Sequence, residues 1–155
     1  MRKVKFRAKF INKDRTFPED RWVYGSYLEH IGTIQDQYQD FDVEVNTLGQ
    51  FTRLVDKNGT EIYEGDIVKF NNQTGKIVFE YGSFGVGIEE GIDYERLEDF
   101  MRENLYNSFD GTFNDNFLPL FEIYYNLNNV DGYIDEVEVI GNIYDNPELL
   151  EVSND

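Results

Sequence analysis

The feature that most constrains this chain is a close succession of tight turns, separated by short apolar segments. The turns are predicted at Asp56–Gly59, Glu64–Asp66 and Asn71–Gly75. Asn58-Gly59 is the strongest hairpin signal, because both residues tolerate a positive φ angle. The following segments, Ile67–Phe70 and Lys76–Tyr81, have the β-branched and aromatic content of strands. This spacing predicts a mainly β protein, a small bent antiparallel barrel or roll that is SH3-like in part. The predicted structural turn residues are Asn58, Gly59, Gly65 and Asp66.

The N-terminal segment Arg2–Phe10 alternates basic and apolar residues, which predicts a half-buried strand with a basic outer face. The basic residues of this face are Lys3, Lys5, Arg7 and Lys9. One interpretation is an edge strand whose cations contact phosphates of a nucleic acid. The other is an edge strand whose lysines prevent pairing between sheets of different molecules. Further strands are expected at Trp22–Leu28 and from Phe41 to Val45.

The segment between about Gly91 and Gly132 is predicted to be a helical insertion into the β fold. Asp93 is a suitable N-cap for an amphipathic helix that extends to about Asn107. The glycine-rich run Gly82–Gly87 before it indicates a kinked or bulged strand rather than a phosphate-binding loop. After the helix, Leu118–Tyr125 is open to either a strand or a short helix, and its aromatic content favours a strand.

The insertion is rich in aromatic residues, which a small barrel has limited inner surface to cover. The candidate interface residues are Phe100, Phe121, Tyr124 and Tyr125. Exposed aromatic patches are typical of protein interfaces, so a homo-oligomer is expected. The alternative is that these rings close the open end of the barrel within one subunit.

The charge of the chain is unevenly distributed and excludes several kinds of chemistry. The net charge is −17, and residues 77–155 contain 2 Lys/Arg against 19 Asp/Glu. Such a field repels nucleic acid and attracts basic partners. The chain has no Cys and 1 His, so no catalytic residue, metal ligand or cofactor site is assigned. No apolar run approaches the roughly 18 residues of a membrane span, so no membrane contact and a cytoplasmic location are expected.

Three segments of the sequence resemble the YopX family of bacteriophage and prophage proteins. They are Lys5–Ala8, the central run from Thr47 to Val68, and Val139–Leu150. One departure is Arg53, where the family usually has Gly. The resemblance implies a small β-rich phage protein of the host bacterial cytoplasm, one domain over residues 1–155, with the insertion at about 91–132. It implies no particular activity.

These observations favour a phage accessory protein that acts by non-enzymatic binding to a host or phage protein. A first alternative is a nucleic-acid-binding small barrel that uses the basic N-terminal strand. A second alternative is an enzyme that uses carboxylate-held magnesium, because the 31 carboxylates leave that chemistry open.

Overall fold

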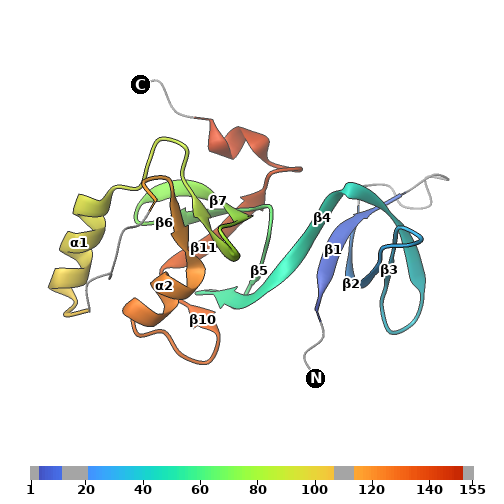
Figure 1. Ribbon diagram of the computed structural model, residues 1–155, viewed down its shortest axis with the longest axis horizontal. Coiled ribbons are helices and arrows are strands. Elements are labelled where there is room, and N and C mark those ends of the chain that lie inside the picture. Colours follow the sequence, from blue (N-terminus) through green and yellow to red (C-terminus); the bar gives the residue numbers. More distant parts are fainter. Residues whose placement is uncertain (1–3, 12–20, 107–113, 152–155) are drawn as a thin grey trace. The chain divides into compact units, whose positions relative to one another are not determined.

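The computed structural model describes residues 4–11, 21–106 and 114–151 (Figure 1). Strands account for 49% of these described residues and helices for 16%, which confirms the predicted mainly β class. The chain divides into two compact units, Met1–Phe51 and Thr52–Asp155, and each is described by itself. The expectation of a single domain stays a prediction.

The first unit is a closed ring of four antiparallel strands that is not a regular barrel (Figure 1). The strands are β1 (Phe6–Phe10), β2 (Trp22–Leu28), β3 (Thr33–Gln35) and β4 (Asp40–Asp56). Each pairs with the next, and β1 also pairs with β4 to close the ring. The small core consists of Ala8, Val23, Ile34 and Val43. β1 therefore has a neighbour on both sides, so the prediction that it is an edge strand is wrong.

The long strand β4 is not extended throughout. Within it, Arg53 has a φ angle of 74°. This left-handed conformation favours glycine, which gives a physical reason for the glycine that the resembling family usually has at this place. On either side, Thr52 Oγ1 donates to Ile62 O (2.8 Å), and Val55 N donates to Gly132 O (2.9 Å). These bonds fix the strand where the backbone bends.

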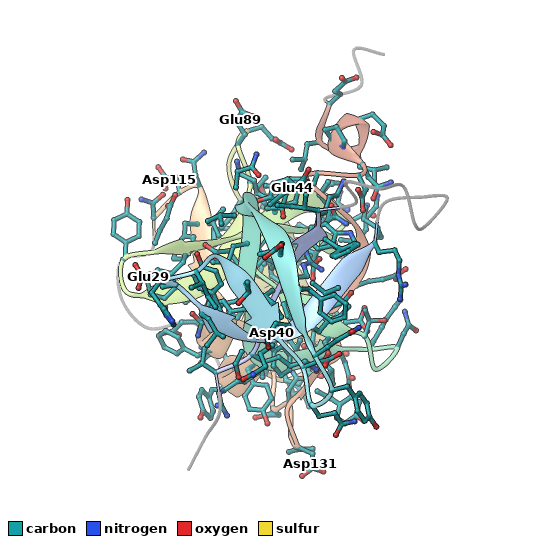
Figure 2. All side chains as sticks on the ribbon, turned by 90° about the vertical axis from the view of Figure 1, so that its right-hand side faces the viewer. Glu29, Asp40, Glu44, Glu89, Asp115 and Asp131 are labelled. Atoms are coloured by element: carbon teal, nitrogen blue, oxygen red, sulfur yellow. The ribbon has the colours of Figure 1, made fainter. Side chains whose placement is uncertain are left out.

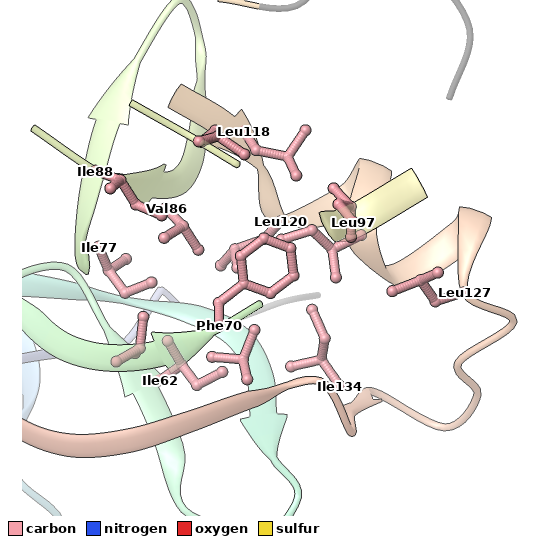
Figure 3. Packing of buried hydrophobic residues seen from close by; sticks show 14 of the residues in the cluster. Ile62, Phe70, Ile77, Val86, Ile88, Leu97, Leu118, Leu120, Leu127 and Ile134 are labelled. Atoms are coloured by element: carbon pink, nitrogen blue, oxygen red, sulfur yellow. The ribbon is translucent and has the colours of Figure 1, made fainter. Parts of the chain in front are cut away.

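The second unit contains a five-stranded sheet in the order β11-β6-β7-β8-β9. Its elements are β5 (Glu61–Tyr63), β6 (Asp66–Phe70), β7 (Gln73–Glu80), β8 (Ser83–Gly87), α1 (Tyr94–Glu103), β9 (Phe117–Pro119), α2 (Leu120–Asn126), β10 (Tyr133–Ile134), β11 (Val137–Asn142) and a 3-10 turn at Pro147–Leu150. Both helices bury their apolar residues in the core beside the sheet (Figure 3). The short strands β5 and β10 pair with the end of β4.

The turn between β4 and β5 is built around the buried side chain of Asp56. Its Oδ1 accepts hydrogen bonds from Asn58 N (2.8 Å) and Thr60 N (2.9 Å). Its Oδ2 accepts one from Val139 N (2.9 Å), which ties the hairpin to β11. Gly59 has a φ angle of 81°, whereas Asn58 does not enter the left-handed region. The turn is thus a type I turn followed by a left-handed glycine, and only Gly59 requires the positive φ expected of both residues.

The next two turns contain fewer residues than the sequence predicts. Gly65 has a φ angle of 94°, and buried Asp66 accepts a hydrogen bond from Tyr63 N (2.7 Å) through Oδ2. The third turn contains only Asn71-Asn72, with φ angles of 56° and 60°, so β7 starts at Gln73 rather than Lys76. This is the two-residue hairpin in which both residues are left-handed, a geometry that Asn adopts more easily than most residues.

Three further expectations are corrected. β8 is a regular strand without a bulge, since all of its residues pair with β7 in register. The helix α1 has the expected cap, Asp93 Oδ1 accepting from Arg96 N (3.1 Å), but it ends at Glu103. Leu118–Tyr125 is mostly helix, because Pro119 ends β9 and precedes the first turn of α2. A proline directly before a helix is compatible with helix initiation, and this signal outweighs the strand propensity of the aromatic residues.

Replacing Gly59 by valine is expected to lower the free energy of unfolding by about 1–2 kcal/mol. No atom lies within 4 Å of the position of a Cβ at Gly59, so the loss comes from backbone strain alone. Gly59→Asn serves as the matched control, because Asn tolerates positive φ and should lose less than half as much. Urea denaturation of both variants measures the difference. Equal midpoints for Gly59→Val and the unmodified protein would contradict the left-handed assignment.

Candidate partner-binding groove

The basic residues of the N-terminal strand lie against aromatic rings of the first unit. Arg7 is 7% exposed, and its guanidinium carbon lies 4.8 Å from the centre of the Trp22 ring. Lys9 Nζ lies 5.8 Å from the same ring, and Lys5 Nζ lies 6.0 Å from the ring of Tyr24. The predicted outward-facing basic ladder is therefore wrong for Arg7. Lys3 lies outside the described residues.

This packing gives the cations a structural role. The register of β1 and β2 places Arg7 opposite Tyr24 and Lys9 opposite Trp22. A cation over an aromatic face contributes about 0.5–2 kcal/mol, with the larger value for desolvated groups. Lys5 and Lys9 are half-buried, so a bound phosphate would have to compete with these ring contacts.

The second unit has a groove of about 580 Å³ with aromatic walls, lined by Tyr81, Gly82, Ser83, Asn114, Phe117, Pro119 and Phe121. The Tyr81 side chain is 78% exposed, and its ring centre lies 5.7 Å from that of Phe117. Tyr81 Oη accepts a hydrogen bond from Asn114 Nδ2 (3.1 Å), which holds the exposed ring in place. The groove therefore presents preorganised aromatic surface to solvent.

Backbone conformation and a hydrogen bond fix the positions of two groove residues, Tyr81 and Asn114. Tyr81-Gly82 forms the turn between β7 and β8, with φ angles of 52° and 80°. Asn114 O accepts a hydrogen bond from Tyr94 Oη (2.9 Å). Burial, and to a lesser degree the nearby Asp115, raise the pKa of Tyr94 above its ordinary value, so this hydroxyl remains a donor at neutral pH.

Close packing also fixes the wall formed by Phe117. A Cβ added at Gly85 would lie 2.4 Å from the Phe117 ring and 2.6 Å from Leu118 O. Only glycine leaves room for β9 to pair with β8 while Phe117 lies across the strand. Gly85 therefore serves the packing of β8 against β9.

Two of the four predicted interface residues lie on the exposed face of α2. Phe121 is 49% exposed and Tyr125, one turn later, is 70% exposed. Tyr124 is half-buried, and its Oη accepts a hydrogen bond from Gly132 N (3.1 Å). Phe100 belongs to α1 and lines a separate cavity. Tyr81 and Pro119 were not recognised from the sequence, although the Tyr81-Gly82 dipeptide is itself a turn signal.

The groove lies in the unit that carries the whole net charge. Residues 1–51 contain equal numbers of basic and acidic residues, so the net charge of −17 falls on residues 52–155. Figure 2 shows the side chains of Glu89, Asp115 and Asp131 projecting outward from the second unit. An aromatic groove in so negative a field favours a positively charged partner.

The ranges that the structure describes contain neither a metal-binding group nor a membrane-spanning helix. No three Asp, Glu or His side chains there come together as a metal-binding group. Each helix in these ranges is also too short or too polar to cross a membrane.

Over the described residues, the fold is that of a mainly β protein with two short α-helices and an exposed aromatic groove. The chain belongs to the YopX family, since the family model described as YopX protein matches residues 5–151. Among solved structures, the chain is similar to protein EF1440 from Enterococcus faecalis. That comparison covers 96% of this chain and 98% of the other, with 22% sequence identity and a TM-score of 0.41. No curated protein matches the sequence.

Proposed function

We propose that this protein acts without catalysis, by binding a basic protein partner in the groove formed by Tyr81, Phe117, Pro119 and Phe121. The observation that supports this proposal is the exposed, preorganised aromatic surface in a unit of net charge −17. Aromatic residues dominate the energetics of protein interfaces, and opposite charge accelerates association. Family membership supports a bacteriophage or prophage origin and action in the host bacterial cytoplasm.

The preferred occupant is a segment with one or two apolar side chains flanked by Lys or Arg. The volume of about 580 Å³ is in the range of pockets that accept a compact ligand or a few side chains. Tyr81 and Phe121 supply rings for apolar contact, and the net charge of −17 on residues 52–155 supplies charge complementarity. Long-range attraction of this kind weakens with salt.

Self-association through Phe121 and Tyr125 is the competing proposal for the same face. Two copies of the second unit would bring two charges of −17 together, which opposes a homo-oligomer at low salt. Nucleic-acid binding through Lys5 and Lys9 has weaker support, because their cations lie over aromatic rings and Arg7 is buried. A basic protein partner is therefore preferred over both.

The double variant Tyr81→Ser/Phe121→Ser is expected to lose the partner. The tagged protein is incubated with lysate of phage-infected host cells, and captured proteins are identified and quantified. A protein captured by the unmodified chain should fall at least about tenfold with the double variant, since aromatic anchors carry much of the binding energy. Tyr38→Ser is the matched control, because Tyr38 is 84% exposed and lies in the first unit.

The salt dependence of capture and the molecular mass in solution distinguish binding of a basic partner from self-association. Capture through this groove should weaken when the salt concentration is raised from 0.1 to about 0.5 M. Light scattering at micromolar concentration should give a monomer without the partner. A dimer that the double variant dissociates would support self-association instead, and capture that survives the double substitution would refute the proposed groove.

A further inference from the structure

A second cavity, separate from the aromatic groove, lies beside α1 in the second unit. It measures about 400 Å³ and is lined by Phe70, Asn71, Asn72, Arg96, Leu97, Phe100, Leu127, Asp135 and Glu136. These residues come from the end of β6, the following turn, α1, the end of α2 and the segment before β11. Figure 3 shows Phe70, Leu97 and Leu127 converging from three of these elements. The size is within the range of small-molecule sites.

The inner wall of this cavity is apolar and firmly packed. Phe70, Leu97 and Leu127 are each at most 2% exposed and belong to the main core. Phe100 is 38% exposed at the rim, and its ring centre lies 6.0 Å from that of Tyr106. The neighbouring turn is held in place by Asn71 Nδ2, which donates to Asp93 O (2.8 Å). A ligand would therefore meet a preformed apolar surface.

The polar end of the cavity contains a half-buried carboxylate, that of Glu136. Glu136 is half-buried, and its Oε1 accepts a hydrogen bond from Asn129 Nδ2 (2.6 Å). Burial raises the pKa of Glu136, the bond from Asn129 opposes this change, and the nearby Asp135 adds to it. Within the described residues, no Lys or Arg nitrogen lies within 4.0 Å of this carboxylate.

The other charged groups around the cavity leave the polar end negative. Arg96 is the basic residue of the lining, but its Nε lies 3.6 Å from Asp93 Oδ2 and its side chain is 51% exposed. Its charge is thus directed to Asp93, the N-cap residue of α1. Asp135 is exposed beside Glu136, so the two carboxylates outweigh the single guanidinium.

We propose that this cavity binds a small organic cation with an apolar body, which packs against Phe70, Leu97 and Leu127 while its ammonium or guanidinium group pairs with Glu136. A cation relieves the repulsion between Glu136 and Asp135 and gives the half-buried Glu136 carboxylate a charged partner. An anion of the same shape meets two carboxylates, and a neutral analogue lacks the ion pair. The site thus discriminates by charge.

The test uses three probes with the same phenethyl body: phenethylammonium, phenethyl alcohol and phenylpropionate. Each is added to the full-length protein at millimolar concentrations, and backbone amide NMR shifts are followed. Phenethylammonium should shift the amides of Asn72, Leu97 and Glu136. It should bind at least about tenfold more tightly than the alcohol. Phenylpropionate should bind more weakly than either.

Glu136→Gln should reduce phenethylammonium affinity about tenfold while leaving that of the alcohol unchanged. Glu89→Gln removes the same charge from an exposed position outside the cavity and should change neither affinity appreciably. The affinity of the unmodified protein should also fall with decreasing pH as Glu136, whose pKa is raised by burial, becomes protonated. Equal affinity for the cation and the alcohol, shifts elsewhere in the chain, or no effect of Glu136→Gln would each overturn the proposal.

Discussion

Asp56→Ala is expected to lower the free energy of unfolding by about 3–5 kcal/mol, because it leaves three backbone N–H groups without their acceptor. The side chain of Asp56 is fully buried and accepts hydrogen bonds from Asn58, Thr60 and Val139. Each orphaned donor costs roughly 1–3 kcal/mol when water cannot replace the lost bond. The loss should appear as a lower midpoint in urea denaturation.

Two further variants separate the causes of this loss. Asp56→Asn keeps one acceptor oxygen but places an amide N–H₂ group at the other position, so it should lose an intermediate amount. Asp115→Ala removes the same side chain at an exposed position and should cost less than about 0.5 kcal/mol. If Asp56→Ala and Asp115→Ala had similar effects, the hydrogen bond from β11 to the hairpin would have no energetic importance.

Phe70→Ala is expected to cost about 3–5 kcal/mol, since Phe70 is 2% exposed and lies at the centre of the main core (Figure 3). The removed ring leaves a void, which also enlarges the cavity beside α1. Thermal and urea denaturation measure the loss. Hydrogen exchange of the α1 amides should increase as well, because Leu97 and Met101 pack in the same core.

Phe79→Ala is the matched control for this substitution. Phe79 is 52% exposed and contacts Phe84 with a centre-to-centre distance of 5.0 Å, so its removal should cost only about 0.5–1.5 kcal/mol. Similar losses for Phe70→Ala and Phe79→Ala would show that the core is not packed as described.

Local sequence signals predict most strands and the first hairpin, because their causes lie within a few residues. The Asp56–Gly59 turn forms where predicted, since glycine and a side-chain acceptor specify it locally. The partner of Asp56 Oδ2 lies 83 residues away at Val139, and no local pattern reveals that contact. The same limit applies to Gly85, whose small size is explained only by the Phe117 ring packed against it.

The sequence also leaves open whether a polar side chain is exposed or buried. Alternation over Arg2–Phe10 predicts a strand, which the structure forms at Phe6–Phe10, but it also places Arg7 in solvent. In the folded protein Arg7 is buried instead, because its guanidinium packs over the ring of Trp22 on the neighbouring strand. The candidate groove was likewise only partly predictable. Phe121 is visible as an excess aromatic residue, whereas its proximity to the Tyr81-Gly82 turn depends on the pairing of β8 with β9.

The closed ring of the first unit has a consequence for the order in which the protein is made. β1 pairs with residues of β4 that follow it by about forty positions, as in Phe6 with Gln50, so the ring cannot close until β4 has left the ribosome. The hairpins of β6, β7 and β8 join strands that are adjacent in the chain. They need only local contacts and can form within microseconds of their synthesis. β1 therefore gains its final neighbour only after β2, β3 and β4 have been made, and β6 waits longer still, because its partner β11 lies further along the chain.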